Sequence, residues 1–364
     1  MASLRQVWVW ISLVALVAVL AVSCRPVKHE MTLGTERLSS EQRLSWPPLP
    51  ETPRYMFLGE LLGVSNFRIA GDDSLNTSGG ALRWLVGLDP TSGFPKDLNY
   101  NMVRPVSGAV DRKGRIMVTD VGLQAVFVFD PIKGELDIWR KASADLSFSA
   151  PAGIAVGPGG SVFIADSALG IVAQLDADGK PMAEIGRDHL KRPVGVAWNP
   201  KKGVLYIADA WEDVIKVFDV TGKLVNVITS ETDDPLFNSP THLTFAHNRL
   251  YVSDTLNAHV LILDPEGHYI ATVGQRGNLM GNMARPKGVA VDSEENIYVV
   301  ESFFDHLLIY DKEGRFLLPI GGTGQGVGQF YLPNGVWTDA GGRIFIADMF
   351  NGRVTVLQFL GGDG

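Results

Sequence analysis

The sequence contains six repeats of about 45 residues, and this repetition restricts the possible folds more than any other feature. Each repeat starts at a proline, and the six starting residues are Pro105, Pro151, Pro193, Pro240, Pro286 and Pro333. About fifteen residues later each repeat reaches an acidic residue, and these are Asp120, Asp166, Asp209, Asp254, Glu301 and Asp348. Because two independent landmarks keep the same period, the sequence predicts a repeated structural unit.

Each repeat contains four short segments that have the composition of β-strands. In residues 285–321 these segments read GVAV, IYVVE, HLLIYD and RFLLPIG, and turn residues separate them. The turn between the third and fourth segments recurs as DADG (176–179), DVTG (219–222) and DPEG (264–267). A period above forty residues with four strands is typical of one propeller blade, so we predict an all-β, six-bladed β-propeller with four-stranded antiparallel blades.

The sixth repeat supplies only three strands before the chain reaches GGDG. The segment RYMFLGELLG (54–63) matches the pattern of a fourth strand, so we expect it to pair with residues 354–360 and close the ring. Such pairing removes the open sheet edge that the last blade otherwise has. The propeller then covers residues 54–360, with an insertion at 64–103 and the blades at 104–360.

The repeated pattern P-x-G-V-A-V, turn, φ-Y-V-A-D, loop, R-φ-x-V-F-D-x-x-G resembles the NHL repeat. The resemblance covers about residues 54–360, and its best single matches are residues 341–357 and 248–263. It implies a six-bladed propeller. NHL propellers include the peptidyl-amidoglycolate lyases, which hold zinc with histidines near the ring axis.

The N-terminus resembles an export signal. Residues 7–22 are apolar and follow Arg5, which predicts a signal peptide over residues 1–23. The stretch 21–24 resembles a bacterial lipobox, which implies lipidation of Cys24, the single cysteine of the chain, and a periplasmic or outer-membrane-associated lipoprotein. Ordinary secretion and an uncleaved N-terminal anchor stay open. Residues 24–53 are polar and rich in proline, so we expect a solvated tether there.

The charge balance argues against nucleic acid as a partner. The chain has 32 Lys and Arg against 40 Asp and Glu, a formal net charge of −8, and no basic stripe. Binding to phosphate backbones needs clustered basic residues.

Inner strands are expected to carry small residues because they crowd around the axis. His242, Thr244 and Trp337 break this rule and are the candidate channel residues. Three protein ligands are needed for catalytic zinc, and only His242 lies on an inner strand, so we assign no metal, cofactor or catalytic residue. The alternative is a lyase or lactonase-like hydrolase with Zn or Ca in the channel and His242 as first ligand. The six acidic landmarks are interpreted as acceptors for loop N–H groups.

Loops after the acidic landmarks carry the candidate binding residues. Aromatic residues follow three of the landmarks by two or three positions, and longer polar residues follow three of them by five positions. These residues are Trp211, Phe303, Phe304 and Phe350, together with His259, His306 and Arg353. We expect them to lie on one face of the ring and to bind a protein, peptide or glycan partner at the cell envelope. Packing between neighbouring loops is the alternative for the aromatic residues.

Overall fold

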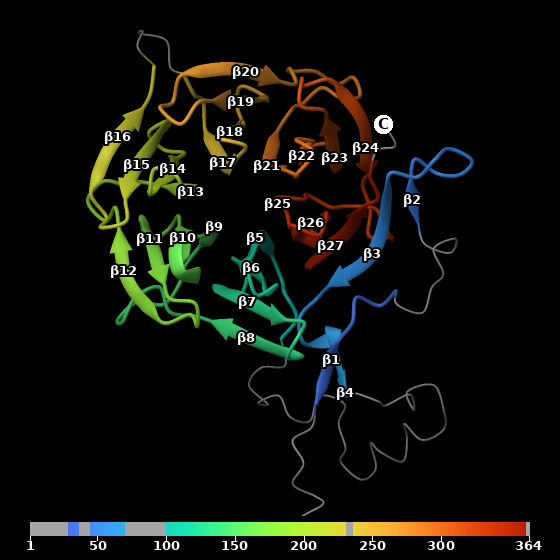
Figure 1. The fold of residues 1–364 in the computed structure, drawn as a ribbon, viewed down its shortest axis with the longest axis horizontal. Coiled ribbons are helices and arrows are strands. Elements are labelled where there is room, and N and C mark those ends of the chain that lie inside the picture. Colours follow the sequence, from blue (N-terminus) through green and yellow to red (C-terminus); the bar gives the residue numbers. More distant parts are fainter. Residues whose placement is uncertain (1–27, 36–43, 70–99, 231–235, 362–364) are drawn as a thin grey trace, which may run out of the picture.

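The computed structural model describes residues 28–35, 44–69, 100–230 and 236–361. The predicted signal peptide (1–23) and Cys24 lie outside these ranges. Figure 1 shows that the chain forms sheets arranged radially around a common centre, with the chain colours running once around the ring. Within the described ranges no helix is long and apolar enough to cross a membrane.

Six four-stranded antiparallel arrangements form the blades, as predicted. Blade 1 is β5 (Pro105–Val110), β6 (Ile116–Asp120), β7 (Ala125–Asp130) and β8 (Glu135–Trp139); blade 2 is β9 (Pro151–Val156), β10 (Val162–Asp166), β11 (Ile171–Leu175) and β12 (Pro181–Ile185); blade 3 is β13 (Pro193–Asn199), β14 (Val204–Asp209), β15 (Val214–Asp219) and β16 (Leu224–Ile228). Blade 4 is β17 (Pro240–Ala246), β18 (Arg249–Asp254), β19 (His259–Leu263) and β20 (Tyr269–Val273); blade 5 is β21 (Pro286–Val291), β22 (Ile297–Glu301), β23 (His306–Tyr310) and β24 (Phe316–Gly321); blade 6 is β25 (Val336–Thr338), β26 (Arg343–Asp348), β27 (Arg353–Phe359) and β3 (Tyr55–Leu61).

Local sequence fixes the turns between the third and fourth strands. Asp264 follows β19, and its Oδ1 accepts hydrogen bonds from the backbone N–H groups of Glu266 and His268, both at 2.9 Å. Gly267 takes a positive φ of 99°, a conformation that most side chains disfavour. The same Asp-centred turn follows the third strand in blades 2 and 3, so each hairpin is set by a few local residues.

The ring is closed by the start of the propeller sequence. β3 pairs antiparallel with β27, with Leu61 opposite Val354 and Tyr55 opposite Phe359. The prediction that residues 54–63 complete the last blade is therefore confirmed. Figure 1 shows β3 as the outer strand of this blade, beside the red C-terminal strands.

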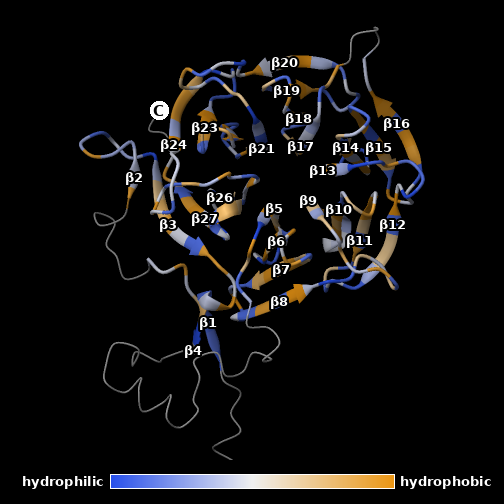
Figure 2. Ribbon diagram, turned by 180° about the vertical axis from the view of Figure 1, so that it is seen from behind, coloured by the Kyte–Doolittle hydropathy of each residue, from blue (hydrophilic) through white to orange (hydrophobic). Residues whose placement is uncertain are grey.

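The hydrophobic core lies between neighbouring blades. Buried apolar residues form six clusters, one at each of the six interfaces between blades. Between blades 3 and 4, for example, Tyr206 and Phe237 pack with Leu243 and Leu263. Figure 2 shows hydrophobic residues, in orange, along many of the strands, whereas the connecting turns are mostly blue or white. Stability therefore depends on every blade having both neighbours.

Two parts of the predicted tether pair with other segments. β1 (His29–Met31) pairs with β4 (Phe67–Ile69), which belongs to the predicted insertion. β2 (Ser45–Trp46) pairs with β3 as a fifth strand on the outside of blade 6. At these residues the chain is held by backbone hydrogen bonds and is not a free solvated segment. The role of residues 24–53 as a tether stays a prediction.

Candidate binding face and central channel

The two faces of the ring are built from different connections. In blades 1 to 5 the inner strand starts at its proline, and antiparallel pairing places the acidic landmark opposite, as with Pro193 and Asp209 or Pro240 and Asp254; in blade 6 Pro333 lies just before the inner strand. The loop between the second and third strands therefore lies on the same face as the prolines, which we call the proline face. The tight turns of the blades lie on the opposite face.

The acidic landmarks accept hydrogen bonds from the backbone of the proline face. All six are buried. Asp209 illustrates their role, because its carboxylate accepts backbone hydrogen bonds from Lys191 at 2.7 Å and Arg192 at 3.0 Å. Asp120, Asp166 and Glu301 bond in the same way to the two residues before their own inner strand. These contacts agree with the interpretation of the acidic residues as acceptors for backbone N–H groups. Most of the donors, however, lie just before the first strand of the blade and not in the loop that leads to the third strand.

The predicted aromatic residues are exposed on the proline face. The exposed fractions are 73% for Trp211, 60% for Phe303 and 47% for Phe350. The half-buried ring of Phe304 supports Phe303 edge-on, with centroids 5.0 Å apart. The alternative for these residues was packing between neighbouring loops. Any such packing leaves three of the four side chains with a large accessible surface.

Further exposed apolar side chains on this face were missed by the sequence analysis. Tyr331 packs edge-on against Phe350 at 5.6 Å, and the guanidinium of Arg104 lies 5.5 Å from the same Phe350 ring. Val103 and Leu256 are further exposed residues of this face, whereas the exposed Leu279, Met280 and Val327 lie in the connections between blades. In or beside the turns of the opposite face, the exposed large apolar residues of the described chain are Ile132, Val220, Tyr269 and Leu360, and the outer strands of blades 2 to 5 expose Met182, Val225, Val227, Ile270 and Leu317. The proline face thus carries a group of exposed aromatic side chains, Trp211, Phe303, Tyr331 and Phe350.

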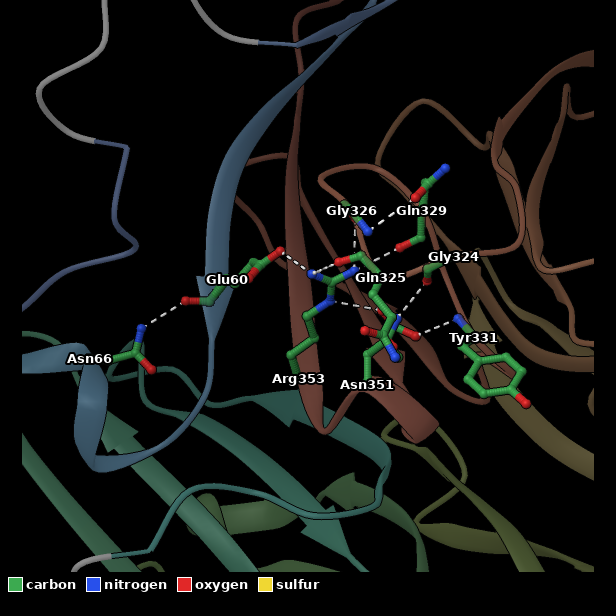
Figure 3. Close-up of polar contacts among 10 residues, drawn as sticks. Glu60, Asn66, Gly324, Gln325, Gly326, Gln329, Tyr331, Asn351 and Arg353 are labelled. Atoms are coloured by element: carbon green, nitrogen blue, oxygen red, sulfur yellow. Dashed lines mark hydrogen bonds and ion pairs between the residues drawn. The ribbon is translucent and has the colours of Figure 1, made fainter.

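Arg353 is placed differently from the prediction, because its side chain is buried. Figure 3 shows its guanidinium between the closing strand and the loop before blade 6. It donates to Asp348 at 2.8 Å, to Glu60 at 2.7 Å, and to three backbone carbonyls of the loop 325–329 at 2.8–3.1 Å. A guanidinium has five N–H groups, so these contacts use its whole donor capacity within the chain.

The Arg353 network continues to Asn66, which sequence reasoning also missed. The Asn66 amide donates to the carbonyls of Glu60 at 2.7 Å and Thr32 at 2.8 Å, and its oxygen accepts from Leu62 and Gly63. Burial raises the pKa of the Glu60 carboxyl, while the positive charge of Arg353 opposes this shift. Arg353 therefore joins the last strand of the ring to β3, and Asn66 holds the end of β3 to Thr32, so both are structural residues here.

His259 and His306 each begin the third strand of a blade. They lie on the proline face but two strands out from the axis, so they do not line the channel. The Nε2 atom of His259 lies 3.5 Å from Asp254 Oδ2, beside an acidic landmark. The two histidines are both half-buried, and neither lines the channel cavity.

The channel contains a cavity of about 270 Å³. All six inner strands contribute to its lining, and of the predicted channel residues Thr244 and Trp337 border it. Trp337 stacks on Phe345 with centroids 5.5 Å apart, and its ring fills the space above Gly108, where a Cβ atom would lie only 2.3 Å from the indole. The wall is mainly Ala and Val, with Trp198, Phe245 and Trp337, so the cavity offers few polar side-chain groups for chemistry.

His242 lies nearer the proline face than this cavity and is buried. Four of the other blades place glycine at its position, and a Cβ atom there would meet the backbone of the next inner strand at 2.3–2.5 Å. The His242 imidazole therefore occupies a position at which the backbones of neighbouring inner strands are in direct contact in other blades. Its Nδ1 atom lies 3.2 Å from Thr241 Oγ1. Burial, and then the charge of Lys287, lower the pKa of His242 to about 3. Among the described residues, no group of three His, Cys, Asp or Glu side chains is arranged to hold a metal ion.

Comparisons with known proteins agree with this architecture. A family model described as a six-bladed β-propeller matches residues 199–311. NHL repeat-containing protein 2 of Bos taurus is 30% identical over 154 residues. The chain is a six-bladed β-propeller that is similar in sequence to NHL repeat-containing proteins. The match to the bovine protein spans 33% of this chain and only 21% of that relative's own length.

Solved structures show the same fold at low identity. Virginiamycin B lyase of Staphylococcus aureus has a TM-score of 0.52 and 14% identity, and the alignment covers 71% of this chain and 96% of that one. An auxiliary nutrient binding protein of Bacteroides thetaiotaomicron has a TM-score of 0.56 and 17% identity, covering 72% and 71%. At such identities the likeness shows a shared propeller fold and nothing about activity.

Proposed function

We propose that this six-bladed propeller is a binding protein that captures a protein or peptide partner on its proline face. The observation that carries this proposal is the group of exposed aromatic side chains that equivalent loops place on this face. Trp211, Phe303 and Phe350 lie in equivalent loops of blades 3, 5 and 6. Exposed aromatic residues held on rigid loops are the residue type that supplies most of the binding energy in protein interfaces.

The loops that carry these rings are fixed before any partner binds. The backbone N–H of Trp211 donates to Asp209 at 3.2 Å, and that of Phe303 donates to Glu301 at 2.8 Å. A loop held in this way loses little conformational freedom on association, so more of the contact energy appears as affinity. The proposal therefore combines exposed apolar area with a preorganised backbone.

Alanine variants of the exposed aromatic residues test this function. We expect Trp211→Ala and Phe303→Ala each to weaken partner binding by about tenfold or more, as measured by surface plasmon resonance with the partner recovered from native extracts. Ile132→Ala and Val220→Ala, on the opposite face, are matched controls that should bind as the wild type does. If the control variants lose as much affinity as the aromatic ones, the proline face is not the binding surface.

We also propose that the N-terminus attaches the propeller to the cell envelope. The support is the sequence alone: an apolar segment at 7–22 followed by Cys24. Lipidation of Cys24 should place the protein in the membrane fraction, whereas Cys24→Ala should release it or leave it unprocessed. Mass spectrometry of the mature N-terminus measures the lipid directly. An unmodified Cys24 in a membrane-bound protein would favour an uncleaved anchor instead.

A further inference from the structure

The centre of the proline face carries positive charges in an alternating pattern. The residue directly before the first proline is arginine in blades 1, 3 and 5, namely Arg104, Arg192 and Arg285. In blades 2, 4 and 6 this position holds Ala150, Ser239 and Leu332. Because the inner strands surround the axis, the three arginines stand at alternate positions around the channel mouth. Lys287, the second residue of β21, lies one step further into the channel.

The backbone of each arginine is held from both sides. The N–H of Arg192 donates to Asp209 at 3.0 Å, and its carbonyl accepts from Ala210 at 3.1 Å. Arg285 is held in the same way by Glu301 at 2.8 Å and by the N–H of Ser302 at 3.2 Å. The buried acidic landmarks therefore fix the points from which these cationic side chains extend.

Lys287 shows that these charges act on one another. Burial, followed by the positive charges of Arg285 and Arg192, lowers the pKa of the half-buried Lys287 to about 8. The charge of Lys287 in turn disfavours a proton on His242, and Asn334 also borders that imidazole. Gly288 bonds through its N–H to the Asn334 carbonyl at 2.7 Å, which holds blades 5 and 6 together at this point.

The neighbouring carboxylates do not neutralise this cluster. Glu212 contacts Lys216, while Asp213 and Asp305 accept the backbone N–H groups of Ser239 and Leu332, each at 2.7 Å. Among the described residues no ion pair is formed by Arg192, Arg285 or Lys287. Like charges gathered at a partly desolvated mouth without a counter-ion are unfavourable, and a bound anion removes that cost.

We infer that the channel mouth on the proline face is a binding site for a small oxyanion, a carboxylate or phosphate group, held by Arg192, Arg285 and Lys287. Guanidinium groups bind such anions through paired hydrogen bonds, and the ammonium adds a point charge. His242 and Asn334 form the polar floor of the site. The site uses none of the exposed aromatic residues, so its test is independent of the test of the partner-binding surface.

Titration calorimetry with two probes, succinate and inorganic phosphate, tests the site. We expect saturable binding of at least one probe at pH 7, and the tighter probe identifies whether the natural ligand carries carboxylate or phosphate. Lys287→Gln should weaken binding about tenfold or more. Lys201→Gln is the matched control, because Lys201 is an exposed lysine in a turn of the opposite face.

The pH dependence gives a second readout. Lys287 is charged below pH 8 and loses its proton above it, so the affinity for succinate should fall by about tenfold between pH 7 and pH 9. Lys287→Arg keeps the charge and should bind succinate equally at both pH values. Failure of both probes to bind the wild type, or wild-type affinity in a folded Lys287→Gln variant, overturns the inference.

Discussion

His242 illustrates how one residue can depart from a repeated pattern at a cost. It is buried between two inner strands at a position where four other blades have glycine. The lowered pKa means that the folded protein binds a proton at this site less readily than the unfolded chain does. The stability that depends on a neutral His242 is therefore present above the unfolded pKa of about 6.5 and is lost as the pH falls towards 3.

The free energy of unfolding should follow this titration. Between pH 6.5 and pH 4 the wild type should lose on the order of 1 kcal/mol per pH unit more than His242→Gln, as measured by urea denaturation. His306→Gln, which changes a half-buried histidine elsewhere, is the control and should keep the wild-type slope. Parallel pH profiles for the wild type and His242→Gln would show that His242 is not the group responsible.

Arg353 is the second residue whose role can be isolated. Arg353→Met leaves Asp348 and Glu60 without their cation, so we expect the free energy of unfolding to fall by about 3 kcal/mol. The matched control is Arg315→Met, because Arg315 pairs with Asp311 at an exposed turn and its loss should leave the thermal midpoint unchanged. Equal midpoints for both variants would contradict a closing role for Arg353.

At the scale of elements, the closing strand β3 is the most informative. Its residues Tyr55, Phe57 and Leu61 are buried in the interfaces of blade 6 with its neighbours. Each buried side chain of this size contributes about 1.5–3 kcal/mol, so the strand accounts for a large share of a typical total stability of about 5–15 kcal/mol. Its removal also exposes the edge of β27.

A truncation starting at residue 63 should therefore fail to give a soluble, cooperatively unfolding monomer. A truncation starting at residue 28 keeps β1, β2 and β3 and should retain the thermal midpoint of the mature protein, as judged by differential scanning calorimetry. If both truncations unfold at the same temperature, β3 does not close the ring in solution.

The sequence periodicity was sufficient to predict most of the strands, because each blade repeats the same proline, acidic and turn landmarks. It also predicted β3, since the last repeat lacked one strand. It could not predict β1 or β2, whose short pairings depend on where the ring brings distant residues together. For the same reason Arg353 was assigned to the surface, although its partners come from 293 residues earlier in the chain and from the preceding loop.

At the scale of the whole molecule, the repeat gives six similar blades, but the two faces differ in chemistry. The proline face combines exposed aromatic rings with a cationic centre, and the opposite face consists of tight Asp- and Gly-containing turns. Single residues on the proline face were identifiable from their spacing after the acidic landmarks. The cationic centre was not, because its members lie in different blades and only the closed ring brings them around one axis.

Site-specific photo-crosslinking tests the central claim, binding through the proline face, most directly. A photoreactive phenylalanine analogue placed at residue 211 or 303 should form a covalent adduct with the bound partner, and the same analogue at residue 132 or 220 should not. Adducts confined to residues 132 and 220, or formed equally at all four positions, would contradict the account.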